Sequence, residues 1–162
     1  MTRKVRLGAV AVVLFALLGT GASASGPRDK DDDDIEVIRV TEMIVQEAGI
    51  DLGEAGDSLG DQFVFSGDLF RSGEKVGIDG GVCTIVRLEP RVSATSQCVA
   101  TAELPKGQIT VQGLLTFTEE TEGEPFRLAI TGGTGKYKEA QGELKVVEIS
   151  ETESELTFKI ID

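Results

Sequence analysis

Short runs rich in valine, isoleucine, threonine and phenylalanine dominate the chain from Ile35 onward. Glycine, proline and aspartate interrupt these runs roughly every 8–12 residues, and no stretch keeps a 3.6-residue apolar period for three turns. Such runs are typical of sheet proteins, because β-branched and aromatic side chains fit a pleated, half-buried surface. The sequence therefore predicts an all-β domain over residues 35–162.

The apolar runs can be counted as separate strands. We expect eight, at Glu36–Gln46, Gln62–Phe70, Gly81–Leu88, Gln97–Leu104, Gln108–Thr118, Phe126–Thr131, Gly142–Ser150 and Glu155–Ile161. Tight-turn sequences such as Arg71–Glu74 and Pro105–Gly107 favour an up-and-down order of antiparallel neighbours. An even number of strands in that order can close on itself, which removes the exposed edges of the sheet.

The first 34 residues differ in character from the rest. Residues 1–24 contain three basic side chains, an apolar run over 7–18 and small residues up to Ala24. This order is typical of a cleaved secretory signal peptide, so we expect a secreted protein. Residues 25–34 include four consecutive aspartates and predict a disordered acidic leader. A calcium loop is the alternative there, although the glycine and the late glutamate of an EF-hand are missing.

Two cysteines, Cys83 and Cys98, lie on consecutive expected strands, at equal distances from a turn centred near Pro90 and Arg91. In that register the two residues face each other across an antiparallel pair. An oxidising compartment favours a disulfide over two free thiols. We therefore predict that a Cys83–Cys98 disulfide joins the two strands.

Composition excludes several classes of function. The formal net charge is −12, so neither nucleic acid nor, after signal cleavage, a membrane is expected as a partner. The chain has no histidine, which rules out a Ser-His-Asp triad and a histidine-ligated metal, and we expect no metal site. Any proton transfer has to use Asp, Glu, Lys, Tyr or Cys.

A glycine-rich segment, LAITGGTGKYKEAQGEL, spans Leu128–Leu144. It is not a phosphate-binding P-loop, because Ile130 stands where that motif needs a glycine and Tyr137 where it needs Ser or Thr. With GQITVQGLLTF at residues 107–117 and PFRLAITGGTGKYKEAQGELKV at 125–146, the chain resembles the allene oxide cyclase and dirigent superfamily. Upstream, GDQFVFSGDLF and VGIDGGVCTIVR are similar to the second and third strands of that family.

The resemblance implies an eight-stranded antiparallel up-and-down β-barrel with an apolar lumen open at one end. It implies that Gly132, Gly133 and Gly135 provide the positive-φ, uncrowded backbone of a tight connection between the sixth and seventh strands. Members of the superfamily act on small apolar or phenolic molecules without a redox cofactor or metal. We accordingly expect a small hydrophobic molecule as partner and no cofactor. Because relatives form dimers and trimers, the resemblance also implies a possible homo-oligomer.

The resemblance also places Glu42 near a first-strand glutamate that stabilises a developing cation in the cyclases. A carboxyl group between Val40 and Ile44 on an inward face would be desolvated and its pKa raised. In the alternative, Glu42 faces solvent and the inward residues are Thr41, Met43 and Val45. The hypothesis that Glu42 is catalytic therefore depends on whether its side chain points into the barrel.

The chain also departs from the superfamily pattern. A water-holding asparagine of the cyclases falls near Gly67, and this chain contains no asparagine. Asp68 is a candidate replacement, or simply a solvated residue. Four aromatic residues are candidates for lining the lumen or, alternatively, for plain core packing: Phe63, Phe65, Phe117 and Phe126.

Two functions remain open from the sequence. The first is a secreted barrel that binds a small hydrophobic molecule and cyclises or isomerises it. The second is a non-enzymatic exported barrel that acts as a binding or interaction module, its interior filled by its own side chains.

Overall fold

The computed structural model describes residues 35–53, 55–89, 92–118, 120–121 and 123–161. The predicted signal peptide and acidic leader lie outside the described residues. Within the described part of the chain, no helix has the length and apolar character needed to cross a bilayer.

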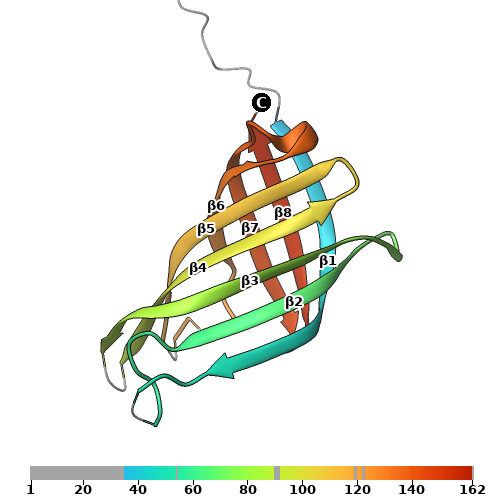
Figure 1. Ribbon diagram of the computed structural model, residues 1–162. Coiled ribbons are helices and arrows are strands. Elements are labelled where there is room, and N and C mark those ends of the chain that lie inside the picture. Colours follow the sequence, from blue (N-terminus) through green and yellow to red (C-terminus); the bar gives the residue numbers. More distant parts are fainter. Residues whose placement is uncertain (1–34, 54, 90–91, 119, 122, 162) are drawn as a thin grey trace, which may run out of the picture. The chain divides into compact units, whose positions relative to one another are not determined.

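Eight antiparallel strands form a closed barrel in sequential order (Figure 1). They are β1 (Ile35–Ile50), β2 (Gln62–Arg71), β3 (Glu74–Glu89), β4 (Ser93–Leu104), β5 (Gly107–Phe117), β6 (Phe126–Gly133), β7 (Gln141–Ser150) and β8 (Glu153–Ile161). The barrel closes because β8 pairs with β1, from Ile35 opposite Ile161 to Met43 opposite Glu153. The predicted fold class is confirmed.

Strand β3 begins seven residues earlier than the sequence indicated, at Glu74 rather than Gly81. Glycines at 77, 80 and 81 obscured this part of the strand in the sequence. Gly77 is needed for close strand approach, since a Cβ atom there would lie 2.0 Å from the carbonyl oxygen of Glu103 on β4. The early start matters because it brings Asp79 into the barrel wall.

One half of the barrel interior is a packed apolar core. Its largest fully buried side chains are Leu69, Ile109, Phe158 and Ile160, from β2, β5 and β8. Each occupies the inward position of an alternating strand, and burying such a side chain stabilises the fold by about 1.5–3 kcal/mol. This packed half includes the end at which β1 begins and β8 ends.

The connection between β6 and β7 contains the short 3₁₀ helix η1 (Gly135–Tyr137), and Tyr137 packs into the core. Gly132 and Gly135 have positive φ angles of 138° and 59°, as predicted. Gly133 does not, and it serves close approach instead. A Cβ atom at Gly133 would lie 2.0 Å from the carbonyl oxygen of Gln108. The segment is therefore a tight structural connection.

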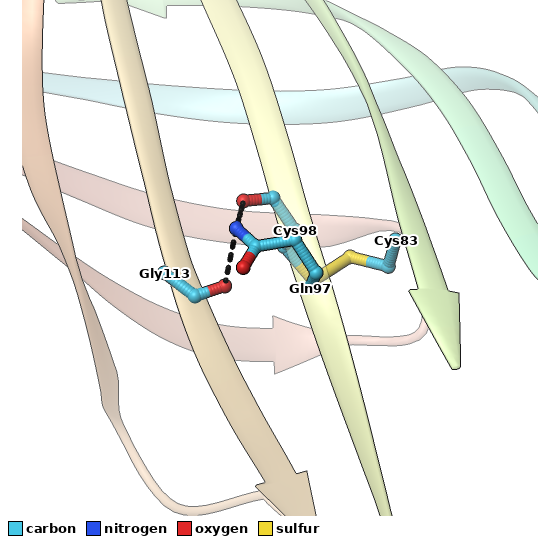
Figure 2. The surroundings of a disulfide bond; sticks show 4 residues. All are labelled: Cys83, Gln97, Cys98 and Gly113. Atoms are coloured by element: carbon cyan, nitrogen blue, oxygen red, sulfur yellow. Dashed lines mark hydrogen bonds between the residues drawn. A yellow bond between two sulfur atoms is a disulfide. The ribbon is translucent and has the colours of Figure 1, made fainter. Parts of the chain in front are cut away.

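A disulfide links Cys83 on β3 to Cys98 on β4, and the two residues are direct partners in the strand register (Figure 2). The side-chain amide of the neighbouring Gln97 donates hydrogen bonds of 3.3 Å to the carbonyl oxygens of Cys98 and Gly113. The disulfide thus joins β3 to β4 at a place where the Gln97 side chain also reinforces the pairing of β4 with β5. The predicted disulfide is confirmed.

Removing the disulfide should destabilise the barrel. For a closed loop with a sequence separation of 15 residues, chain entropy in the unfolded state accounts for about 3 kcal/mol. We expect the Cys83→Ala/Cys98→Ala double variant to lose roughly this free energy of unfolding in urea titrations. The parent protein, measured in a reducing agent, controls for the truncated side chains. An unchanged free energy in both samples would show that the bond does not stabilise the fold.

Candidate active site

The other half of the barrel interior contains a cavity of about 520 Å³, which we call the inner cavity. All eight strands contribute to its wall. The wall is largely apolar, and its aliphatic residues include Ile44, Val99, Leu115, Leu128, Leu144, Val146 and Leu156. On β1, β2, β4, β5, β6 and β8, the inward residues further toward the η1 end belong to the packed core. The core therefore forms the floor of the inner cavity.

Two carboxyl groups, from Glu42 on β1 and Asp79 on β3, lie together in the wall of the inner cavity. They belong to strands separated by β2, and the residue between them is Gly67. In the strand register, Gly67 on β2 is opposite Asp79 on β3 and opposite Ile44 on β1. Ile44 is two residues after Glu42 and lines the same cavity. Because Gly67 has no side chain, the two acidic side chains can meet above it.

The space above Gly67 is fully used. A Cβ atom at this position would lie 2.8 Å from Oδ1 of Asp79 and 3.0 Å from Cγ of Glu42. Both distances are below ordinary van der Waals contact. The glycine is therefore a requirement for the pairing of the two acids.

The electrostatic state of Glu42 reflects its surroundings. Its side chain is only 6% exposed, and its pKa is raised to about 8, with burial as the largest cause. The negative charge of Asp79 and a hydrogen bond from protonated Glu42 to Asp79 add to the rise, whereas a hydrogen bond from Ser154, its register partner on β8, opposes it. Near neutral pH, Glu42 accordingly holds a proton.

Asp79 is the second member of the pair. Burial raises its pKa as well, whereas hydrogen bonds from Glu42 and from the backbone N–H groups of Gly67 and Asp79 oppose that rise. Its Oδ1 atom is buried and has no hydrogen-bond partner among the described residues. The pair therefore consists of a proton donor and a proton acceptor in a largely apolar cavity.

The four predicted aromatic residues all line the inner cavity. Phe63 and Phe65 on β2 stack with their ring centroids 6.1 Å apart. Phe63 and Phe117 are about half exposed, whereas Phe126 packs against the core. These rings form part of the wall that a bound molecule would touch.

Two alternatives from the sequence do not match the structure. Met43 and Val45, the inward residues if Glu42 faced solvent, are 45% and 60% exposed. Asp68, the candidate replacement for the missing asparagine, forms an ion pair with Lys75 at 2.6 Å and does not line the inner cavity. The acidic partner of Glu42 is instead Asp79.

Asp79 was missed because the expected third strand began at Gly81. A signal was nevertheless present, since alternation places Asp79, Gly81 and Cys83 on the same face of β3. Extending the strand backward from the cysteine would have placed Asp79 inside the barrel. The glycines around it hid that continuation, because glycine normally weakens a strand prediction.

Comparison with known proteins identifies the family of this barrel. The family model described as allene oxide cyclase barrel like domain matches residues 41–160. The chain belongs to this family. No curated protein matches the chain at a significant level.

Solved structures of similar proteins include enzymes. A structure described as pyocyanin demethylase has a TM-score of 0.69 and 32% identity, covering 77% of this chain and 99% of that chain. The structure of AbnU, an exo-specific intermolecular Diels-Alderase, has a TM-score of 0.64 and 17% identity, covering 78% of this chain and 97% of that chain. The structure of a nonspecific heme-binding cyclase that catalyses a [4 + 2] cycloaddition in neoabyssomicin biosynthesis has a TM-score of 0.64 and 18% identity. It covers 81% of this chain and 66% of that chain. The last two are similar to this chain in fold alone.

Haem ligation does not fit the inner cavity of this chain. Protein ligands to haem iron are histidine, cysteine thiolate, methionine or tyrosine. The described residues that line the inner cavity include no histidine, methionine or tyrosine. The two cysteines in the lining, Cys83 and Cys98, are joined in the disulfide and offer no thiolate.

Introducing a methyl group at Gly67 should separate the acid pair. We expect Gly67→Ala to lose about 1–3 kcal/mol of stability through overpacking and to bring the pKa of Glu42 back toward 4.5. Urea denaturation and carboxyl-carbon NMR titration measure the two effects. Gly49→Ala on β1 is the matched control, since a Cβ atom there meets nothing within 4 Å. A normal NMR titration of Glu42 in the parent protein would contradict the pairing.

The stability of the barrel should fall as pH rises. Because the folded pKa of Glu42, about 8, lies above the ordinary glutamate value of 4.5, the folded state holds a proton that the unfolded state releases. This stabilisation is complete below about pH 4.5 and is lost as pH rises toward and through about 8. We expect Glu42→Gln to reduce this slope in urea titrations across that range. Equal slopes in parent and variant would contradict the raised pKa.

Proposed function

We propose that this protein binds a small apolar molecule in the inner cavity and catalyses its isomerisation or cyclisation by proton transfer. The observation that carries the proposal is the buried Glu42–Asp79 pair in the wall of a largely apolar cavity of about 520 Å³. Cavities of this volume are suited to small organic ligands. A few polar groups in an apolar wall orient a ligand and act on it strongly, because little water screens them.

The two carboxyl groups have different roles in the proposed reaction. Ionised Asp79 accepts a proton from an acidic C–H bond of the ligand, and the protonated Glu42 donates one to a carbonyl or other acceptor oxygen. The bond electrons stay within the ligand, so the product is an isomer and no oxidant or reductant is needed. Environments that separate the proton affinities of two neighbouring acids are typical of acid–base catalysis.

The similar proteins support a small-molecule function. Their descriptions name a demethylase of pyocyanin and two catalysts of cycloaddition. All act on small organic molecules, and one of them shares 32% of its residues with this chain. The reaction proposed here is inferred from the acid pair and is not transferred from those proteins.

The inner cavity counts against a barrel filled entirely by its own side chains, the form in which a non-enzymatic module was expected. A binding protein without catalysis remains an outcome of the experiment below. We further propose that the protein is exported, which the Cys83–Cys98 disulfide supports, since such bonds persist in oxidising compartments. Self-association stays a prediction.

A neutral bicyclic ketone tests the proposed chemistry. We expect the protein to accelerate exchange of the benzylic protons of 2-tetralone in deuterium oxide, measured by NMR. Glu42→Gln and Asp79→Asn should each lower the exchange rate at least about a hundredfold, the usual contribution of a positioned acid or base. Binding of the ketone, measured by calorimetry, should persist in both variants.

The controls separate the possible results. The Glu155→Gln variant should catalyse proton exchange of the ketone at the parental rate. Glu155 is an exposed residue of β8 outside the cavity lining. Binding without accelerated exchange would leave a non-enzymatic binding module. Exchange that survives both substitutions would show that the acid pair is not the catalytic group.

A further inference from the structure

A second cavity, of about 530 Å³, adjoins the inner cavity and is called the outer cavity here. Its lining includes the β1–β2 connection and the adjacent ends of β1 to β5. Phe63, Cys83 and Phe117 line both cavities. A molecule in the inner cavity is therefore next to the residues of the outer one.

Both cavities carry carboxyl groups. Besides the Glu42–Asp79 pair, the inner cavity is lined by Glu47, Glu148 and Glu151, which we call the rim glutamates. The rim glutamates lie in exposed positions, on β1 and around the β7–β8 turn. The outer cavity adds three aspartates, Asp51, Asp57 and Asp61. Both linings are therefore rich in negative charge.

The charge of Asp61 is secured by its own hydrogen bonds. Its carboxylate accepts bonds from the backbone N–H groups of Leu52 and Ser58, at 2.8 and 2.7 Å. These bonds lower the pKa of Asp61. The outer cavity accordingly keeps this negative charge at neutral pH.

No lysine or arginine occurs among the described residues that line either cavity. Among the described residues, basic side chains form ion pairs away from the two cavities, for example Arg127 with Glu143 and Lys75 with Asp68. The rim glutamates form no ion pair with a described basic residue. The negative charge at the cavities is therefore not neutralised by a basic residue of the described lining.

Aromatic rings lie beside these carboxyl groups. The stacked pair Phe63 and Phe65 is part of the inner wall, and Phe63 and Phe117 border both cavities. The face of an aromatic ring carries negative electrostatic potential and attracts organic cations. The rings and the carboxylates thus favour the same sign of ligand charge.

We propose that the inner cavity selects aromatic cations over anions of the same shape. This inference rests on the proposed function, because it assumes that the inner cavity is the ligand-binding site. A fatty acid or other carboxylate would be repelled by the rim glutamates and would find no basic partner in the described lining. A cation would be attracted to the rim glutamates and to the ring faces, and a neutral ligand would fall between the two.

Three naphthalene derivatives of nearly equal size test the charge selection: 1-naphthylmethylammonium, neutral 1-naphthalenemethanol and 1-naphthoate. The chain has no tryptophan, so naphthalene fluorescence anisotropy reports binding with little protein background. At low salt and neutral pH we expect the ammonium to bind at least about tenfold more tightly than the carboxylate, with the alcohol intermediate. Raising the salt concentration should reduce this ratio, because exposed charges are screened.

Variants identify the groups responsible. The triple variant Glu47→Gln/Glu148→Gln/Glu151→Gln should lower the ammonium-to-carboxylate ratio at least about threefold, and it should change binding of the neutral alcohol less than binding of either charged compound. The matched control is Glu74→Gln/Glu103→Gln/Glu139→Gln, which alters the net charge equally at exposed positions outside both cavities. The ammonium-to-carboxylate ratio of this control variant should equal that of the parent protein.

The outcomes distinguish this inference from the proposed function. If all three compounds bind equally, or the carboxylate binds best, charge selection is wrong while the inner cavity remains a binding site. If the control variant lowers the ratio as much as the rim variant, the selection arises from total charge and the assignment to the rim is wrong. If none of the compounds binds, both the inference and the proposed function fail.

Discussion

The pairing of β8 with β1 is the constraint on which the rest of the structure depends. It closes a sequential sheet into a barrel, in which each strand is hydrogen-bonded to two neighbours. Closure also gives the sheet an inside, toward which every second side chain of each strand points. Leu69, Ile109 and Phe158 fill one half of that interior. The inward residues of the other half are arranged so that about 520 Å³ remains open.

The open half concentrates the chemical groups of the barrel. Glu42 and Asp79 come from strands that are not neighbours, and they meet only because the strand between them carries Gly67 at that level. The core below and the apolar wall around them limit their solvation, which raises the pKa of both carboxyl groups. An apolar cavity and a reactive acid pair are thus two consequences of the same packing.

Much of the fold could be predicted from the sequence, because strand periodicity and turn residues are local signals. The number of strands and the Cys83–Cys98 register follow from such signals, whereas the tight connection at Gly135 followed from the family resemblance. The start of β3 was predicted too late, since its glycines serve contacts with β2 and β4 that the local sequence does not show. The acid pair was half predicted: Glu42 was considered, and Asp79 lay in the part of β3 that was missed.

The sequence by itself determined an all-β chain with eight strands and a disulfide between two of them. It also narrowed proton chemistry to a short list of side chains, because a chain without histidine has few other groups that titrate near neutral pH. Only the tertiary structure decided which way Glu42 faces and that Asp79 is its partner. The physical reason is that both questions concern residues on different strands. Their proximity and their loss of hydration exist only once the barrel has closed around them.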